Sequence, residues 1–527
     1  MELMCDARVV HRAVISTLLI SGMCAAPVAA WAQDSQAQDA DMGERLKRLE
    51  ARQEAYEREL DEKNATIEAL QKRLVEVEAG PGSIAEGSPT PPLPTAASAA
   101  PASPVAAGDA QPAATPAAPA IAQGPSSTEP FGQFTPGRGF TVARTSWGEL
   151  QLSVYSYLRY LNLSGLDDTY ADHFGNTKPV QNRNDFQVNK IFLYTQGWLL
   201  DPKFRYTFYV WSSGPLLGTS TNTLVAGNLT YTFNDAFTLG GGIFPLPSTR
   251  SMDGQFPYWH RVDARMIADE FMRGSFSQGV WASGRINKTL TYRAGLANNL
   301  NAFGVPASRL DSRLDTFSGA LIWMPSTGEF GPRGGFGDFE RHEELATLFS
   351  ARITTSTEDR ENQPGQEQPE NTQIRLSSGV TAFTPNALAP GATVNTLEYQ
   401  LVAASAGMKY KGFYLEGEAY WRTLDNFRAT GVLPVTRLRD SGALLQGSFM
   451  AVPESVQIYA NGSKIWGEYG NPWDAGLGVN WWPYKKRQFR VNGELMYLDS
   501  SPVGSVTLPY LIGSTGYTFA VSAELAF

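Results

Sequence analysis

The sequence predicts an all-β fold, a transmembrane antiparallel β-barrel of about 16 strands, preceded by a short coiled coil and a Pro/Ala-rich linker. Three observations predict it. Much of the chain after residue 148 consists of segments in which apolar and polar residues alternate, as in a strand with two unlike faces. Along the chain, short connections between these segments alternate with long ones. No apolar run approaches the ~20 residues that a membrane-spanning helix needs.

Residues 1–32 have the features of a secretory signal. A basic start precedes an apolar core at 13–20 and a small-x-small cleavage motif at 30–32. Both cysteines, Cys5 and Cys24, lie inside this segment. We therefore expect an exported mature chain with no thiol and no disulfide.

Residues 43–79 predict a coiled coil, because apolar residues recur at a 3-4 spacing with Glu, Lys and Arg between them. Gln53 and Lys63 interrupt the apolar seam. A single amphipathic helix with so narrow a stripe has nothing else to pack on, so we expect association, and the number of helices stays open. Residues 80–128 contain eleven prolines, which is typical of an extended spacer or of a loose tether.

Residues 129–527 form the predicted barrel. The first strand runs from Glu149 to Tyr160, and the third contains Lys203 to Val210. Short connections are expected at 201–202, 234–235 and 287–288, and long ones at roughly 161–184, 212–224, 245–275 and 298–312. Further strands are expected at Thr396–Lys409, Phe413–Thr423, Ser441–Val452, Trp473–Tyr484 and Gln488–Asp499. The stretches 325–342 and 355–395 are the least regular, and an even strand count would place both barrel ends in the periplasm.

The final strand carries the strongest single pattern. Its apolar face consists of Tyr517, Phe519, Val521, Ala523, Leu525 and Phe527. In a soluble protein this strand would be an aggregation-prone edge, whereas in a closed barrel it pairs with the first strand and meets lipid. The stretch resembles the C-terminal signal that the barrel-assembly machinery of bacteria reads.

The connection after the fifth strand, Pro245 to Ser275, is expected to fold inward and narrow the lumen. Its candidate constriction residues are Arg250, His260, Arg261, Arg265 and Arg273. It also holds the acids Asp253, Asp263, Asp269 and Glu270, so it has either opposed charged walls or internal salt bridges. Strand alternation points further cations inward: Arg159, Lys203, Arg205, Arg285, Arg293, Arg422 and Arg490. The inward acids are Glu416, Glu418, Glu494 and Glu524, so the balance predicts a weak preference for anions.

The chain resembles the phosphate-selective porin O and P family. The signal, coiled coil, linker and barrel follow that family's layout, and local stretches are similar at 148–152, 239–245, 284–286, 292–296 and 471–481. The resemblance implies a homotrimeric pore, with lysines on the inward loop where phosphate is selected. Residues 245–275 contain no lysine, so phosphate specificity is not expected.

The function expected from these observations is passive diffusion of small hydrophilic or anionic solutes across the outer membrane of a Gram-negative bacterium. Outer-membrane lipid and the assembly machinery are the expected partners. The alternative is a structural protein that tethers the membrane through its periplasmic coiled coil. An enzyme is not expected, because His173, His260 and His342 lie on no clear strand beside a serine. No cofactor, metal or nucleic acid is expected either, since the net charge of −9 includes no basic tract.

Overall fold

The computed structural model describes most of the predicted barrel. The described residues are 132–213, 222–254, 257–301, 310–311, 313–361, 372, 374–505 and 508–527. The predicted signal (1–32), coiled coil (43–79) and linker (80–128) lie outside them. Among the described residues, no helix is both long and apolar enough to cross a membrane.

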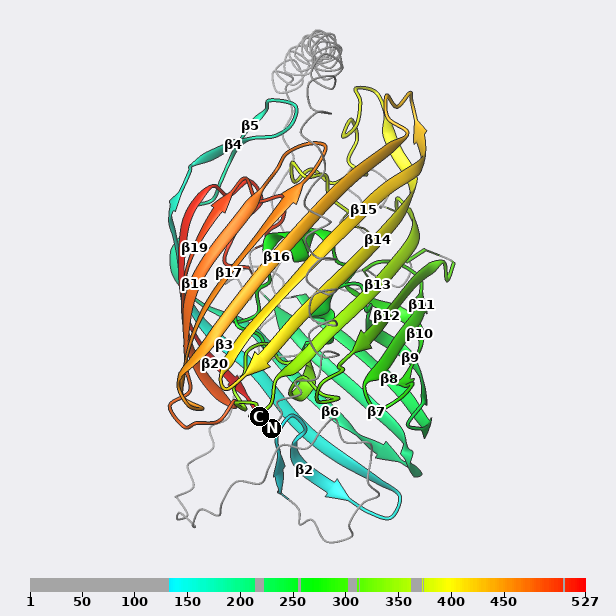
Figure 1. Ribbon diagram of the computed structural model, residues 1–527. Helices are drawn as coiled ribbons and strands as arrows, with labels where there is room; N and C mark the ends of the chain where they lie inside the picture. Colours follow the sequence, from blue (N-terminus) through cyan, green and yellow to red (C-terminus); the bar gives the residue numbers. More distant parts are fainter. Residues whose placement is uncertain are drawn as a thin grey trace, which may run out of the picture. The chain divides into compact units, whose positions relative to one another are not determined.

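Sixteen strands form a closed antiparallel barrel in chain order (Figure 1), which confirms the predicted fold class. They are β3 (Gly148–Leu166), β6 (Asn184–Leu199), β7 (Asp201–Ser213), β8 (Asn222–Asn234), β9 (Phe237–Pro245), β10 (Phe276–Arg285), β11 (Leu290–Ala297), β12 (Thr316–Trp323), β13 (Ala346–Asp359), β14 (Thr393–Tyr410), β15 (Phe413–Thr430), β16 (Arg437–Val452), β17 (Val456–Trp466), β18 (Trp473–Trp481), β19 (Phe489–Asp499) and β20 (Gly516–Ala526). The ring closes where β20 pairs with β3, with Ala526 opposite Tyr155 and Gly516 opposite Leu166.

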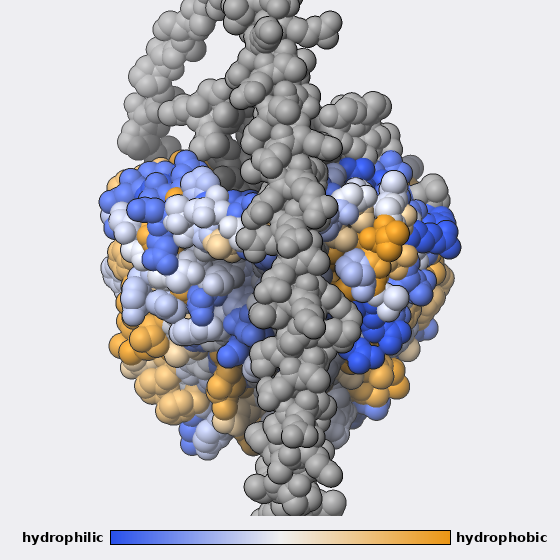
Figure 2. All heavy atoms as spheres, turned by 90° about the horizontal axis from the view of Figure 1, so that it is seen from above, coloured by the Kyte–Doolittle hydropathy of each residue, from blue (hydrophilic) through white to orange (hydrophobic). Residues whose placement is uncertain are grey.

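Successive side chains of each strand point alternately to lipid and to the lumen. On β3, Leu158 is 55% exposed on the outer face, whereas Arg159 beside it is 1% exposed. Other strands repeat this alternation, with Val225 and Leu477 among the exposed outer residues. Seen from above, the end of the barrel is largely hydrophilic, and hydrophobic residues gather towards the rim (Figure 2). An apolar outer face around a polar interior is the arrangement of a membrane-spanning barrel.

The connections follow the predicted asymmetry with one exception. Short turns at 235–236, 286–289, 411–412 and 453–455 lie at one end, called here the short-turn side. Long connections lie at the other, loop side, at 167–183, 246–275, 298–315, 360–392 and 500–515. The exception is the β12–β13 connection, residues 324–345, which is long although it belongs to the short-turn side and contains η4 (Pro332–Gly334). The first strand also continues to Leu166, beyond its predicted end.

A small hairpin covers the edge of β3 that β20 does not reach. It consists of β1 (Phe134–Thr135) and β2 (Gly139–Arg144), and β2 pairs with residues 149–152 of β3. Between the two partners of β3, Phe527 exchanges backbone hydrogen bonds of 2.6 and 2.9 Å with Val154. Paired in this way, the start of β3 is not left as an open edge.

Several connections fold into the barrel and fill much of it. Residues 246–275, called here the inner loop, contain η2 (Arg250–Asp253) and α3 (Ile267–Met272). Ile267 and Met272 are fully buried, in a cluster with apolar residues of the 360–392 and 500–515 loops. Phe330 and Phe336 of the β12–β13 connection pack with Trp259 of the inner loop. A second hairpin, β4 (Thr169–Ala171) and β5 (Thr177–Pro179), lies at the top of Figure 1.

Candidate functional site

The inner loop lies inside the ring of strands, as predicted, and α3 packs against β16, β17 and β18. Its backbone is held by wall side chains. The Ala268 N–H donates to Ser463 Oγ at 3.1 Å, and the Tyr399 hydroxyl donates to the carbonyl of Met272. On the opposite side, Arg159 Nη2 donates to the Val262 carbonyl at 2.7 Å. The loop is therefore fixed across the lumen.

Two loop arginines form buried ion pairs with the barrel wall. Arg250 Nε lies 3.1 Å from Glu416 Oε2, and the Arg250 N–H donates to Glu418 Oε1 at 2.8 Å. Arg261 Nε lies 2.6 Å from Glu494 Oε1 on β19, and Arg261 Nη1 lies 3.4 Å from Asp474 Oδ2 on β18. These two arginines therefore connect the inner loop to the barrel wall through ion pairs.

Two loop acids reach other strands. Asp253 pairs with Arg352 of β13 and, at 3.0 Å, with Arg293 of β11. Asp263 accepts a hydrogen bond from Lys190 Nζ of β6 at 2.6 Å. The inner loop is thus linked by charge to both sides of the lumen, and opposed positive and negative walls along the pore stay a prediction.

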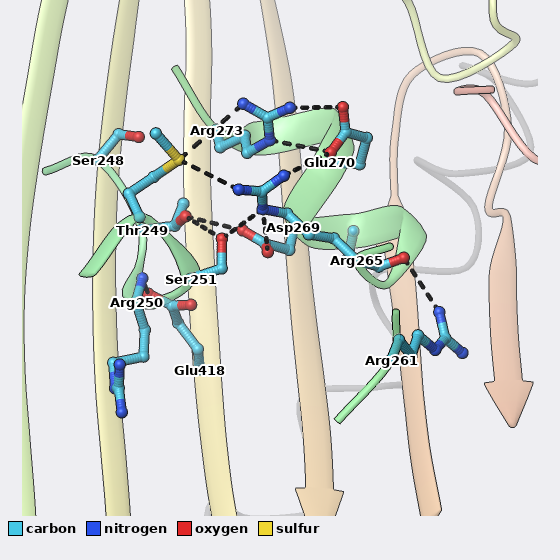
Figure 3. A network of polar contacts seen from close by, with 12 residues as sticks. Ser248, Thr249, Arg250, Ser251, Arg261, Arg265, Asp269, Glu270, Arg273 and Glu418 are labelled. Carbon is cyan, nitrogen blue, oxygen red and sulfur yellow. Dashed lines mark hydrogen bonds and ion pairs between the residues drawn. The ribbon is translucent and has the colours of Figure 1, made fainter. Parts of the chain in front are cut away.

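Internal salt bridges, the second expected arrangement, occur at the C-terminal part of the same loop (Figure 3). Arg273 Nη2 lies 2.6 Å from Glu270 Oε1. Arg265 lies 3.6 Å from Glu270 Oε2 and 3.7 Å from Asp269 Oδ2. Asp269 also accepts a 2.7 Å hydrogen bond from Thr249 Oγ1, which joins α3 to the segment before η2. The loop is cross-linked within itself and to the wall.

His173, His260 and His342 lie on connections and not on strands, as expected, but the first two each contact a serine. His260 Nε2 lies 3.1 Å from Ser448 Oγ, and burial, with Arg490 and Lys409 nearby, lowers the pKa of His260 to about 3. His173 Nδ1 lies 2.7 Å from Ser378 Oγ, and its Nε2 contacts a backbone carbonyl. The two ring nitrogens of His173 thus contact a serine hydroxyl and a backbone carbonyl, which differs from the serine and carboxylate partners of a Ser-His-acid triad.

The nine candidate pore residues fall into three groups. Four are buried in contacts between loop and wall: Arg159, Arg250, His260 and Arg261. Two border a cavity on the loop side: Arg265 and Arg273. Three project from strands on the opposite wall, where they are partly or largely exposed: Arg205, Arg285 and Arg293. The lining of the conducting path by these residues stays a prediction.

The cavity that Arg265 and Arg273 border has a volume of about 300 Å³ and is called here the loop-side chamber. Lys190, Trp211, Arg375 and Arg422 complete its polar part. Sequence reasoning missed Lys190, Trp211 and Arg375. Strand alternation could have found the first two, whereas Arg375 lies in the irregular 360–392 loop and carries no signal. Among the described residues, no group of three or more His, Cys, Asp or Glu is placed to hold a metal ion.

The β12–β13 connection docks beneath the inner loop through cations that donate to its backbone. Lys409 Nζ donates to the carbonyls of Phe330 and Gly335 at 2.8 and 3.0 Å, and Arg250 Nη1 donates to that of Gly334 at 3.0 Å.

The β12–β13 connection also contains His342, which forms hydrogen bonds with Asp338 and, at 2.8 Å, with Glu329. Burial alone would lower the pKa of His342, but the bonds to the two carboxylates outweigh it and raise the pKa to about 9.

Because it contains His342, the β12–β13 connection should make the free energy of unfolding depend on pH. Because the folded pKa of His342 is raised above its ordinary value of 6.5, its contribution is complete below about pH 6.5 and is lost as the pH rises through about 9. We expect unfolding in detergent to become easier across this window by roughly 2–3 kcal/mol. The change His342→Gln should remove the contribution of His342 to this dependence, and His173→Gln should leave it. An equal pH dependence in His342→Gln would contradict the prediction.

Comparisons with known proteins give structural similarity only. No family model and no curated protein matches the chain. OmpT of Vibrio cholerae, an outer-membrane protein, is similar at 9% identity and a TM-score of 0.45, over 73% of this chain and 99% of that one. The outer membrane channel DcaP of Acinetobacter baumannii is similar at 8% identity and a TM-score of 0.45, over 73% of this chain and 99% of that one. An anion-selective porin from Comamonas acidovorans is similar at 11% identity and a TM-score of 0.43, over 72% of this chain and 100% of that one. At these identities and scores the likeness carries no functional inference.

Proposed function

We propose that the protein is an outer-membrane porin, a water-filled channel for passive diffusion of small hydrophilic solutes with a preference for anions. The observation that carries this proposal is the accessibility of the inward face of β7–β11. Arg293 points into the lumen and contacts the inner loop, yet its side chain is 45% exposed. Water therefore reaches the wall that the inner loop does not fill, inside a closed barrel with an apolar outer face.

The charge on that wall supports anion preference. Lys203, Arg205, Arg285 and Arg293 point inward from β7, β10 and β11. The only acid on β7–β11 is Asp201, at the first position of β7. Pores lined by Arg and Lys favour anions. The sequence resemblance to phosphate-selective porins agrees with an anion channel, and the absence of lysine from the inner loop argues against phosphate as its specific solute.

The same proposal includes the orientation of the barrel in the outer membrane, its oligomeric state and its export. The short-turn side faces the periplasm, where residues 43–79 form a coiled coil tethered by residues 80–128, and three copies assemble into a homotrimer. Residues 1–32 direct export, and the final strand is read by the barrel-assembly machinery. Native mass spectrometry of the purified protein tests the trimer, and removal of residues 33–128 tests whether the coiled coil stabilises it.

Reversal potentials in planar bilayers under a salt gradient test the channel. We expect discrete conductance steps and a reversal potential that favours anions. The triple variant Lys203→Gln, Arg205→Gln, Arg285→Gln should lose most of this preference, because it removes three lumenal charges. The matched control is Arg439→Gln, which changes an exposed arginine of β16 aligned with Thr423. A folded wild-type protein that prefers cations would refute the anion preference, and one without conductance would refute the channel.

A further inference from the structure

The loop-side chamber is lined by both basic and apolar side chains. Its cations come from the strands, the inner loop and the 360–392 loop: Lys190, Arg265, Arg273, Arg375 and Arg422. Its aliphatic residues, called here its apolar side, come from three loops at the loop side of the barrel: Leu300, Ile374, Val503 and Leu508. The acids on the chamber are Asp263, Glu270 and Glu358, so cations exceed acids. A cavity of this composition favours an anion that also has an apolar part.

Most of the chamber's cations are already neutralised by a carboxylate. Lys190 is paired with Asp263, and Arg265 and Arg273 are paired with Glu270. Arg422 lies on β15 and is paired with Asp440 of β16. These pairs hold the walls in place, and an incoming anion would have to compete with them.

Arg375 differs from these cations. Its Nη1 donates to the Gly379 carbonyl at 2.8 Å and to Thr381 Oγ1 at 3.3 Å, both neutral oxygens. Arg422 Nη2 donates to the Arg375 carbonyl at 2.8 Å, which fixes the backbone. Within the described ranges, Arg375 has no carboxylate partner and its Nε and Nη2 have no hydrogen-bond acceptor. That edge of a guanidinium is the fork that binds a carboxylate through two parallel hydrogen bonds.

We propose that the loop-side chamber is a binding site for small organic carboxylates with a compact apolar body, in which Arg375 binds the carboxylate. The proposal deepens the porin function above, on which it rests for its role in transport, by naming the class of solute. The apolar body lies against Leu300, Ile374, Val503 and Leu508, and it gains free energy as that surface leaves water. An inorganic anion gains nothing from the apolar side.

Inorganic phosphate fits the chamber less well for a second reason. A phosphate has oxygens on all sides and is bound well where several donors converge on it. Here the guanidinium groups of Arg273 and Arg422 are engaged by Glu270 and Asp440. Arg265 is bound to Ser251 and paired with Glu270, and Lys190 is paired with Asp263, so the open fork is the Nε–Nη2 edge of Arg375. One bidentate fork beside an apolar wall matches a monocarboxylate.

The test compares four solutes in planar bilayers containing the full-length protein. Benzoate has both the charge and the apolar body, benzamide has the body alone, acetate has the charge alone, and phosphate is the inorganic anion. We expect benzoate to interrupt the current at concentrations about tenfold or more below those of the other three, because benzamide lacks the charged hydrogen bond and acetate and phosphate lack the apolar body. Equal potency of benzoate and acetate, or of benzoate and phosphate, would overturn the proposal.

Two variants locate the effect. Arg375→Gln should weaken benzoate block, measured relative to the open-channel current of the same variant, about tenfold or more, whereas the matched control Arg439→Gln should behave as wild type. Leu508→Asn should weaken benzoate block and leave acetate unaffected, because it changes only the apolar side. Unchanged benzoate block in a folded Arg375→Gln protein would overturn the assignment of that residue.

A separate binding measurement distinguishes this proposal from the porin function. Isothermal titration of benzoate into the folded protein in detergent needs no conductance. Binding that Arg375→Gln abolishes would support the chamber even if the bilayer showed no channel. Absence of benzoate binding to a conducting protein would overturn the chamber and leave the channel intact.

Discussion

Replacing residues 249–272 of the inner loop by a short Gly-Ser connection should raise the single-channel conductance several-fold. The segment fills the lumen between β3 and the β13–β19 wall, and its removal opens that volume to water and ions. A short connection can close the gap, because Pro245 and Phe276, at the two ends of the loop, are already paired across β9 and β10. Conductance steps in planar bilayers measure the effect.

The control for this deletion removes a loop segment outside the ring of strands. Deleting residues 169–179, the β4–β5 hairpin, should leave the conductance close to that of the wild type. Folding of both variants is verified by the heat-dependent migration that intact barrels show on gels. If a folded inner-loop deletion conducts as the wild type does, the inner loop does not narrow the ion path.

The barrel could be predicted from the sequence because its rule is local. Alternating residues define a strand and its two faces, so β3 and β20 were found with the correct faces. The rule weakens where the outer face is not apolar. β17 was not predicted as a separate strand. Its outer positions include Ala460, Gly462 and Lys464, so the outer face is hardly more hydrophobic than the inner face. The β12–β13 connection lies in one of the least regular stretches of the sequence, and its Phe330 and Phe336 pack under the inner loop.

The candidate site was predictable in position but not in its contacts. Strand order placed the inner loop in the lumen, and alternation turned Arg159 and Glu494 inward. The partners are far apart in the chain: Arg261 meets Asp474 and Glu494 more than two hundred residues later. Register and barrel curvature decide such pairs, and a single sequence contains neither. The sequence therefore predicted which groups share the lumen, and only the structure shows which of them are neutralised.

Arg261→Met should destabilise the protein by about 3–5 kcal/mol, the cost of leaving buried carboxylates without their counter-charge. Arg261 is 3% exposed, and the carboxylates of Asp474 and Glu494 beside it are just as inaccessible. Methionine has similar length and keeps much of the packing, so the change removes mainly the charge and its hydrogen bonds. Urea unfolding followed by tryptophan fluorescence measures the difference, with the exposed Arg439→Met expected within about 0.5 kcal/mol of wild type.

A triple variant separates the lost charge from the lost anchor. In Arg261→Met, Asp474→Asn, Glu494→Gln the carboxylates become neutral amides, so most of the stability should return, as when a buried ion pair is replaced by groups of similar volume. If the free energy of unfolding returns to the wild-type value while the conductance rises, the Arg261 ion pairs hold the inner loop in place but add no net stability to the barrel. If the triple variant is as unstable as the single one, the unpaired carboxylates are not the cause, and the loss of the 2.6 Å bond to Asn461 and of loop docking must account for it.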